Sequence, residues 1–252
     1  MSNVIEVKDL TIGYGDKVIQ KDLSFEVKEA EIFGILGGSG CGKSTLLKHM
    51  IGLYTPFSGD IRIFNESIVK ADEEAKRVIM RKFGVTYQGG ALFGSMTVGE
   101  NIALPLQEYT NKSPAEIDEV INEKLRMVDL EGAAGVMPSE LSGGMRKRAG
   151  LARAMALDPT LLFFDEPSAG LDPITSAELD RLILSLRERL GTTIVIVTHE
   201  LDSVFTVMDR VIMLDKTTRT MAAQGPPREL RDHSNNPWVH DFLTRAGLKS
   251  VE

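Results

Sequence analysis

The chain has one cysteine, few aromatic residues and no long apolar run. A single thiol, Cys41, excludes an intrachain disulfide framework and leaves no cysteine cluster for a structural zinc site. The longest apolar runs, such as 161–164 and 194–197, fall far short of the roughly 18 to 20 residues that span a bilayer, so we expect no transmembrane segment. The N-terminus lacks a basic region followed by an apolar stretch, which predicts no secretory signal and a cytosolic protein.

An excess of positive charge is also missing, because the formal net charge is −7. This balance argues against nucleic acid or anionic lipid as a direct, nonspecific partner, so we expect any membrane attachment to run through another protein. A chain of 252 residues with 42% hydrophobic composition can bury a sizeable core. It predicts one globular domain, or an α/β body with an inserted subdomain.

A glycine-rich segment follows an apolar strand predicted at 31–36 and precedes a helix predicted at 43–51. Glycines let successive backbone N–H groups, and the N-terminus of the helix, face one anion, while Lys43 adds charge near β- and γ-phosphates and Ser44 offers a hydroxyl to Mg²⁺. A plain turn before a helix is the alternative, and kinases and GTPases carry such loops too. The expected nucleotide contacts are Gly37, Gly38, Ser39, Gly40, Cys41, Gly42, Lys43, Ser44 and Thr45.

An acidic pair, Asp165 and Glu166, follows four apolar residues that predict a buried strand. A carboxylate at such a strand end can hold Mg²⁺ directly or through water, and we assign this role to Asp165. The side chain of the next residue, Glu166, is expected to point in a different direction from that of Asp165. A solvated acidic turn is the alternative interpretation.

Between these segments lies Leu141-Ser142-Gly143-Gly144-Met145, which opens a predicted helix at 142–157. The Ser142 hydroxyl and two unobstructed glycine N–H groups predict a second phosphate-binding end in the same chain. Taken alone, Ser-Gly-Gly is more often an ordinary turn or helix cap. Together with the other two segments, it narrows the possible NTPases sharply.

The three segments, in this order and spacing, resemble those of ABC transporter nucleotide-binding subunits, from about Val4 to about Leu243. The resemblance implies ATP and Mg²⁺ as ligands and Glu166 as the general base or water-polarising residue. It implies that Thr45 contacts the α-phosphate and that Asp172 contacts a partner subunit. The signature of each subunit, Ser142 to Gly144 here, would then close over the nucleotide of the other in a head-to-tail homodimer.

Three single residues complete the predicted site by the same resemblance. Tyr14 matches the aromatic that stacks on adenine, Gln88 the glutamine that senses Mg²⁺ and the γ-phosphate, and His199 the histidine that contacts the γ-phosphate. The alternatives are a strand aromatic, a surface loop residue and a helix-capping group, respectively. We interpret Cys41 and His49 as non-catalytic, and we expect His49 on the surface of the phosphate-loop helix.

The pattern of elements predicts the α/β fold of a P-loop NTPase, with a mostly parallel core sheet and a small N-terminal antiparallel layer formed by 4–10 and 23–27. A capping box at Ser113 starts a helix expected to end near Leu130. With the helix at 142–157, it suggests a helical subdomain at about 91–158, inserted in a single ABC ATPase domain at 1–243. We expect strands at 160–164, 192–198 and 210–214, a helix at 175–190, a loop and short docked helix near 225–243, and a tail at 244–252.

The segment from Gln88 to Leu106, together with Met145 and the arginine after it, resembles ATPases of bacterial lipid transporters that work with MCE proteins, the Mla group. That resemblance implies a phospholipid cargo, a permease dimer, an MCE protein, a small STAS-domain protein and a place on the cytoplasmic face of the inner membrane. Osmoprotectant importers can carry the same signature and remain an alternative, as do amino acid importers. Ribosome- or DNA-acting ABC ATPases and a small-molecule kinase fit the sequence less well, and no nucleic-acid partner is expected.

Overall fold

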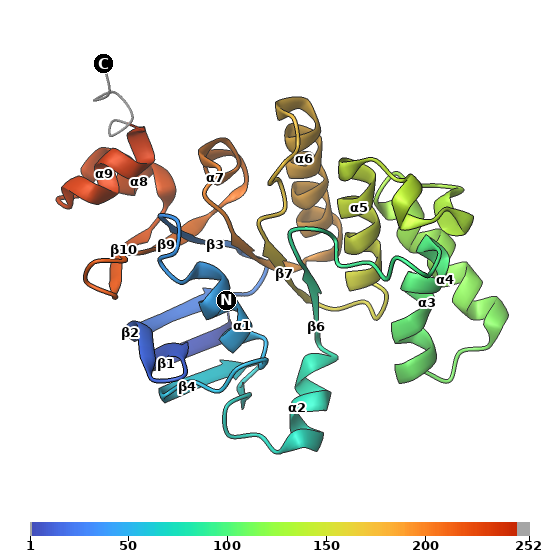
Figure 1. Ribbon diagram of the computed structural model, residues 1–252, viewed down its shortest axis with the longest axis horizontal. Helices are drawn as coiled ribbons and strands as arrows, with labels where there is room; N and C mark the ends of the chain where they lie inside the picture. The colour runs from blue at the N-terminus through green and yellow to red at the C-terminus, as the bar shows by residue number, and fades with distance from the viewer. Residues whose placement is uncertain (1, 246–252) are drawn as a thin grey trace.

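The computed structural model describes residues 2–245, so the end of the expected tail, 246–252, lies outside the described residues. Two sheets organise the chain (Figure 1). The core sheet has the order β10-β9-β3-β8-β7-β6, and β9, β3, β8, β7 and β6 run parallel. Its strands are β3 (Ile32–Gly37), β6 (Phe83–Thr86), β7 (Leu161–Asp165), β8 (Thr193–Val197), β9 (Arg210–Leu214) and the antiparallel β10 (Met221–Gly225). The predicted α/β fold with a mostly parallel sheet is confirmed.

The second sheet is antiparallel and lies at the N-terminal side, as the alternating sequence pattern predicts. Its strands, in the order β2-β1-β4-β5, are β1 (Asn3–Tyr14), β2 (Lys17–Lys28), β4 (Ser58–Ile63) and β5 (Glu66–Ser67). Both β1 and β2 extend beyond the predicted ranges, because the alternation continues through bulges into the hairpin turn.

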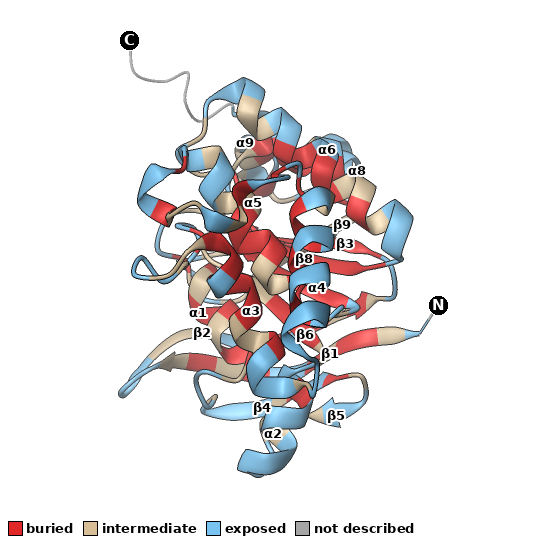
Figure 2. Cartoon of the chain, turned by 90° about the vertical axis from the view of Figure 1, so that its right-hand side faces the viewer, coloured by how far each residue is buried: buried red, intermediate tan, exposed pale blue. Residues whose placement is uncertain are grey.

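Successive residues of the core strands face opposite sides of the sheet, so each face has its own hydrophobic cluster. Phe33 and Phe163 pack with the antiparallel sheet and with α1 (Lys43–Met50). Leu162 and Phe164 pack on the other face with the helices, and Figure 2 shows these central strands as buried. The helices of that face include α5 (Gly143–Ala154), α6 (Pro173–Leu190) and α7 (Leu201–Val207).

The helices α3 (Val98–Tyr109), α4 (Pro114–Met127) and α5 gather at one side of the core sheet (Figure 1). The predicted capping box of α4 is present: the Ser113 N–H donates to Glu116 Oε2 at 2.7 Å and the Glu116 N–H donates to Ser113 Oγ at 3.4 Å. The expected ends of the helices at 113–130 and 142–157 were too late by about three residues. Two 3₁₀ turns, Ala133–Gly135 and Pro138–Glu140, connect α4 to α5.

The remaining helices are α2 (Glu73–Met80), α8 (Pro227–His233) and α9 (Pro237–Thr244). The sequence predicted a short docked helix near the end of the chain, which α9 confirms, but the prediction of a loop across 225–236 was wrong. Pro227 occupies the first turn of α8, where a proline costs no hydrogen bond, so the Pro-Pro pair starts a helix. No described helix is both long enough and apolar enough to span a membrane.

The surface position expected for His49 was wrong, because the side chain is only 1% exposed. Its Nδ1 lies 2.8 Å from the carbonyl oxygen of Thr45, one turn earlier in α1. Burial lowers the pKa of His49 below its ordinary value. Since α1 is packed by the antiparallel sheet and the core strands, little of this helix is left to face solvent.

A close approach between backbones fixes α5 against the loop that follows β6. A Cβ added to Gly150 would lie 2.6 Å from the carbonyl oxygen of Gly90, and a backbone atom cannot rotate away. We therefore expect Gly150→Ala to lower the free energy of unfolding by roughly 1–3 kcal/mol, despite alanine's better helix propensity. Urea unfolding would measure this loss. Gly135→Ala, where the new methyl group meets no atom within 4 Å, is the control, and an equally stable Gly150→Ala variant would contradict the packing argument.

Candidate nucleotide-binding and hydrolysis site

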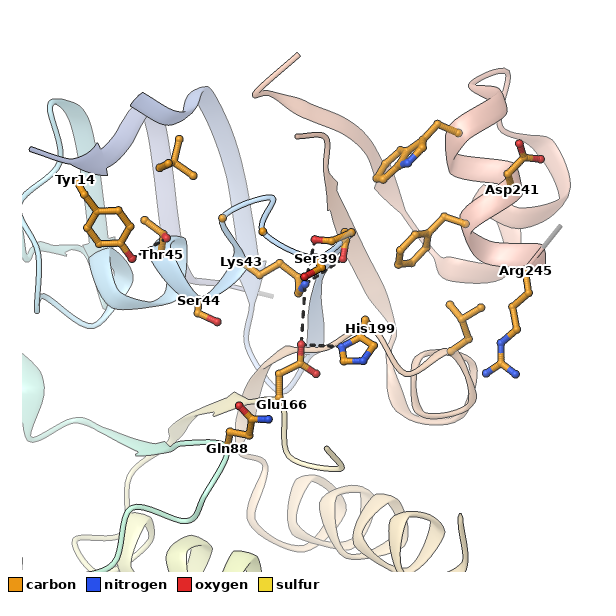
Figure 3. A pocket seen from close by; sticks show the side chains of 18 residues that line it. Tyr14, Ser39, Lys43, Ser44, Thr45, Gln88, Glu166, His199, Asp241 and Arg245 are labelled. Carbon is orange, nitrogen blue, oxygen red and sulfur yellow. Dashed lines mark hydrogen bonds and ion pairs between the residues drawn. The ribbon is translucent and has the colours of Figure 1, made fainter. Parts of the chain in front are cut away.

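The strand order places the candidate site residues side by side at the carboxyl ends of the parallel strands. The glycine-rich loop leaves β3, and the neighbouring strands β8, β7 and β6 lead in turn to His199, Glu166 and Gln88. These four segments, distant in sequence, surround one cavity of about 1020 Å³ (Figure 3). The cavity is lined by Tyr14, Ile19, Gly37, Gly38, Ser39, Gly40, Gly42, Lys43, Ser44, Thr45, Gln88, Glu166, His199, Leu201, Trp238, Asp241, Phe242 and Arg245.

The loop between β3 and α1 has the backbone that its glycines predict. Gly37, Gly40 and Gly42 have φ values of 148°, 71° and 106°, a region that side chains with a Cβ rarely adopt. Lys43 is 9% exposed and its Nζ donates to the carbonyl oxygen of Gly37 at 3.0 Å. This arrangement brings the loop's N–H groups, the start of α1 and an ammonium to one place, which suits a polyphosphate anion.

Cys41, although part of the loop, does not belong to the cavity lining. Its side chain is 2% exposed and a Cβ on Gly37 would lie 2.6 Å from its Sγ, so the thiol packs behind the loop. Burial raises the pKa of the Cys41 thiol, and the charge of Lys43 opposes this shift only in part.

Asp165 lies behind Ser44, whose Oγ donates to Asp165 Oδ1 at 3.0 Å. Burial raises the pKa of Asp165 above its ordinary value and the negative charge of Glu166 adds to this, while the hydrogen bond from Ser44 and the charges of Lys48 and Lys43 oppose it. A hydroxyl and a carboxylate are hard oxygen ligands of the kind that Mg²⁺ prefers. Within 2–245, no three His, Cys, Asp or Glu side chains form a potential metal cluster.

Glu166 is held at the centre of the cavity, 13% exposed. Its Oε1 lies 2.9 Å from His199 Nδ1 and 4.0 Å from Lys43 Nζ (Figure 3). Its buried Oε2 has no hydrogen-bond partner among the described residues. The backbone of Glu166 is left-handed, with φ 50°, which is strained for a side chain of this size. The Glu166 carboxylate thus lies in the cavity lining between an ammonium and an imidazole.

The aromatic end of the cavity contains Tyr14, which is 44% exposed. Its hydroxyl lies 2.8 Å from Thr45 Oγ1, and its ring meets the ring of Tyr54 edge-on with 5.4 Å between centroids. The position of Tyr14 beside the phosphate loop fits a ring that contacts a base. Trp238 and Phe242 of α9 also line the cavity.

Besides Cys41, five predicted site residues do not line this cavity: Asp165, which lies next to it behind Ser44, and Ser142, Gly143, Gly144 and Asp172. Ser142 caps α5, because its Oγ accepts a hydrogen bond from the Met145 N–H at 3.2 Å. Asp172 caps α6 by accepting from the N–H groups of Ile174 and Thr175. A chain with a complete phosphate loop therefore carries a second exposed helix start away from its own nucleotide cavity.

Comparison with known proteins identifies the family that has this combination. The model of the family described as ABC transporter matches residues 20–169. The chain belongs to the ABC transporter family. It is an ABC-type ATPase, whose reaction converts ATP and water to ADP and phosphate.

Relatives of this ABC ATPase differ in the cargo that their names give. A protein of Mycobacterium leprae named probable ribonucleotide transport ATP-binding protein mkl is 43% identical over 243 residues, covering 96% of this chain and 69% of the relative. A protein of Haemophilus influenzae named intermembrane phospholipid transport system ATP-binding protein MlaF is 40% identical over 228 residues, covering 90% and 86%. Its Escherichia coli counterpart is 38% identical over 244 residues, covering 96% and 89%.

Solved structures support the same fold for this ATPase. The structure of cbiO1 from Clostridium perfringens, described as part of an ABC transporter complex, superposes with a TM-score of 0.84 at 26% identity, covering 99% of this chain and 96% of that one. A dimeric cassette, MJ0796, in a post-hydrolysis state with ADP and Pi superposes with a TM-score of 0.80 at 30% identity, covering 88% and 98%.

Proposed function

We propose that the protein is the ATPase subunit of a bacterial phospholipid ABC transporter that works with an MCE protein. The observation that carries this cargo assignment is the similarity to proteins named for intermembrane phospholipid transport, which extends over 90% of the chain and 86% of the relative. The subunit acts at the cytoplasmic face of the inner membrane, bound to a permease dimer. The mycobacterial relative's name gives ribonucleotide as the competing cargo, which the experiment below separates from phospholipid.

ATP binds with its phosphates on the loop from Gly37 to Thr45 and its adenine against Tyr14. The positive φ values of the loop glycines and the buried Lys43 support this orientation, because they bring donors and charge to one end of the cavity. Tyr14 and Thr45 share a hydrogen bond of 2.8 Å, so the base and phosphate ends of the site are connected by one contact.

Ser44, Asp165 and Gln88 provide the protein oxygens that would hold Mg²⁺ beside the phosphates. The 3.0 Å hydrogen bond from Ser44 to Asp165 supports the assignment, because it places two oxygen ligands together at the foot of the loop. Bound Mg²⁺ would neutralise charge on the β- and γ-phosphates and so favour loss of the γ-phosphoryl group.

Glu166 acts as the general base and His199 positions it. A water oxygen forms the new bond to the γ-phosphorus, the bond from that phosphorus to the ADP oxygen breaks, and the water proton moves to the Glu166 carboxylate. The 2.9 Å contact to His199 supports this assignment because it orients the carboxylate, and Lys43 lies close enough to stabilise charge on the γ-phosphate.

Two subunits assemble head to tail, and each supplies its Ser142 to Gly144 helix start and its Asp172 to the other's nucleotide. The support is geometric: these residues lie away from the chain's own cavity, and the start of α5 offers N–H groups to an anion. The similarity to a cassette whose structure is dimeric, at 31% identity and a TM-score of 0.80, agrees with this arrangement.

The permease contacts a second cavity, of about 560 Å³, between α3 and the β6 region. Phe93 lines this cavity and is 51% exposed, and the Arg153 guanidinium lies 5.9 Å from its ring centre. At the far wall, Arg81 stacks over Tyr109 at 4.6 Å. Aromatic rings beside arginines suit an amphipathic helix with acidic residues at its edge.

We expect Phe93→Glu to abolish co-purification of the permease, because it places a negative charge on the apolar wall of this cavity. Affinity purification from the native membrane in mild detergent, followed by mass spectrometry, measures the loss. ATP binding by the isolated subunit should be unchanged, and Val78→Glu, also an exposed apolar position, is the matched control. Permease recovered with Phe93→Glu at the level of the unsubstituted protein would contradict the docking assignment.

The same purification tests the cargo and the other partners. Recovery of a small permease, an MCE protein, a STAS-domain protein and bound phospholipid supports the proposal. Recovery of a permease with bound ribonucleotide, or of one that depends on a periplasmic solute-binding protein, would overturn the phospholipid assignment and leave the ATPase chemistry intact.

A further inference from the structure

Lys147 of α5 points its ammonium at the backbone that follows Glu166. Its Nζ donates to the carbonyl oxygens of Pro167 at 2.5 Å and Ala169 at 2.6 Å, and it lies 3.5 Å from that of Glu166. An ammonium has three donors and no acceptor, so these three oxygens match its full hydrogen-bonding capacity.

This arrangement is unusual for a lysine on a helix, because such side chains normally extend into water or pair with a carboxylate. Lys147 is half-buried, and no carboxylate of residues 2–245 lies within ion-pair distance of its Nζ. Burial lowers the pKa of Lys147, while the nearby charge of Glu166 acts in the opposite direction. The ammonium thus forms its hydrogen bonds with backbone carbonyl oxygens.

The loop that receives these hydrogen bonds is strained where it matters for hydrolysis. Glu166 has φ 50°, a left-handed conformation that is unfavourable for a residue with a Cβ. Its N–H donates to the carbonyl oxygen of Val197 at 2.8 Å, and the Ala169 N–H donates back to the Glu166 carbonyl oxygen at 3.2 Å. Surrounding contacts must hold such a conformation, and Lys147 contributes to the same turn.

The helix that carries Lys147 also carries the signature. Ser142, its cap, precedes Lys147 by five residues, so the ammonium lies little more than one turn from the helix start. The start of α5 also packs against the start of α6, because a Cβ on Gly144 would lie 2.7 Å from Thr175 Cγ2. The signature helix and the loop after Glu166 are therefore joined by direct hydrogen bonds.

We propose that Lys147 is a positioning residue for ATP hydrolysis. Its hydrogen bonds to the 166–169 backbone orient the Glu166 carboxylate toward the phosphate cavity. They also couple this orientation to the position of the signature helix. This inference rests on the role proposed above for Glu166. Lys147 itself does not line the phosphate cavity.

Lys147→Met removes all three donors and keeps the length of the side chain. We expect kcat for ATP to fall by roughly 10- to 100-fold, since a small displacement of a reacting group has effects of this size. The dissociation constant for ATP should stay within about twofold, because the phosphate loop is untouched. Lys147→Arg should restore part of kcat, since a guanidinium can donate to the same carbonyl oxygens.

Steady-state phosphate release and ATP titration of the purified subunit provide both constants. Lys82→Met is the matched control. The Lys82 Nζ lies 2.7 Å from Glu66 Oε2, and neither residue lines the phosphate cavity. Should Lys147→Met fail to fold, as judged by circular dichroism, Lys147→Gln provides the same comparison. A variant without a full set of donors that turns over as fast as the unsubstituted protein overturns the inference, and so does an arginine variant as slow as the methionine one.

Glu166→Gln separates this inference from the one on which it rests. If Glu166→Gln has a low kcat and Lys147→Met a normal one, only the role of Lys147 is rejected. If Glu166→Gln has a normal kcat, the assignment of Glu166 as the base is rejected. If both assignments hold, the double variant should be no slower than Glu166→Gln. Once residue 166 carries an amide that cannot accept the proton, its orientation no longer affects the rate.

Discussion

Glu166→Gln is expected to bind ATP as tightly as the unsubstituted protein and to hydrolyse it roughly 10²–10⁴-fold more slowly. The amide has the volume of the carboxylate but cannot take a proton, so the loss falls on kcat. The position of Glu166 makes the effect large: Oε1 is fixed by His199 at 2.9 Å, and the buried Oε2 is left unpaired within the described chain. Phosphate release measures turnover, and size-exclusion chromatography with ATP should show an accumulated dimer.

Glu188→Gln is the control for this change, because it removes an exposed carboxylate of α6 far along the helix from the cavity. Its turnover should equal that of the unsubstituted protein. A Glu166→Gln variant within about threefold of normal turnover would show that another group activates the water. The accumulated dimer tests ATP-dependent pairing of the subunits separately, because ATP that stays bound keeps the two subunits closed.

Lys43→Ala is expected to weaken ATP binding by about 100-fold, which corresponds to roughly 2.7 kcal/mol. The ammonium is nearly buried and donates to a loop carbonyl, so it is held where the β- and γ-phosphates would lie. Hydrogen bonds to charged groups contribute about 1.5–3 kcal/mol each, and a phosphate oxygen offers such an acceptor. Isothermal titration with MgATP measures the change.

Lys82→Ala is the charge-matched control for Lys43→Ala and should bind ATP normally. Unfolding curves of both variants should agree with that of the unsubstituted protein, because Lys43 contributes more to ATP binding than to the stability of the core. A dissociation constant for Lys43→Ala within about twofold of normal would mean that the backbone N–H groups hold the phosphates alone.

The sequence predicted those parts of the site that depend on local chemistry. The loop glycines, the Ser113 capping box and the acidic end of β7 are each specified by a few adjacent residues, and all lie where the pattern indicates. The antiparallel layer was recognised for the same reason, because alternation is a local property.

Other features depend on contacts between distant segments, which adjacent residues do not specify. The order of β3, β8, β7 and β6 sets which side chains meet in the cavity, yet no residue type encodes it. His49 is polar on a helix that both sheets cover, so a surface prediction was wrong. Lys147 was missed because its acceptors are backbone carbonyl oxygens, which every residue possesses.

The burial of Cys41 has a practical consequence for spectroscopy. Its Sγ is packed behind the phosphate loop, and its raised pKa keeps the reactive thiolate scarce at neutral pH. Since this is the chain's one cysteine, the natural protein can serve as its own background for site-directed labelling. A cysteine introduced at an exposed position would carry the maleimide spin label or fluorophore almost alone, and distances between two labelled subunits would report opening and closing during turnover.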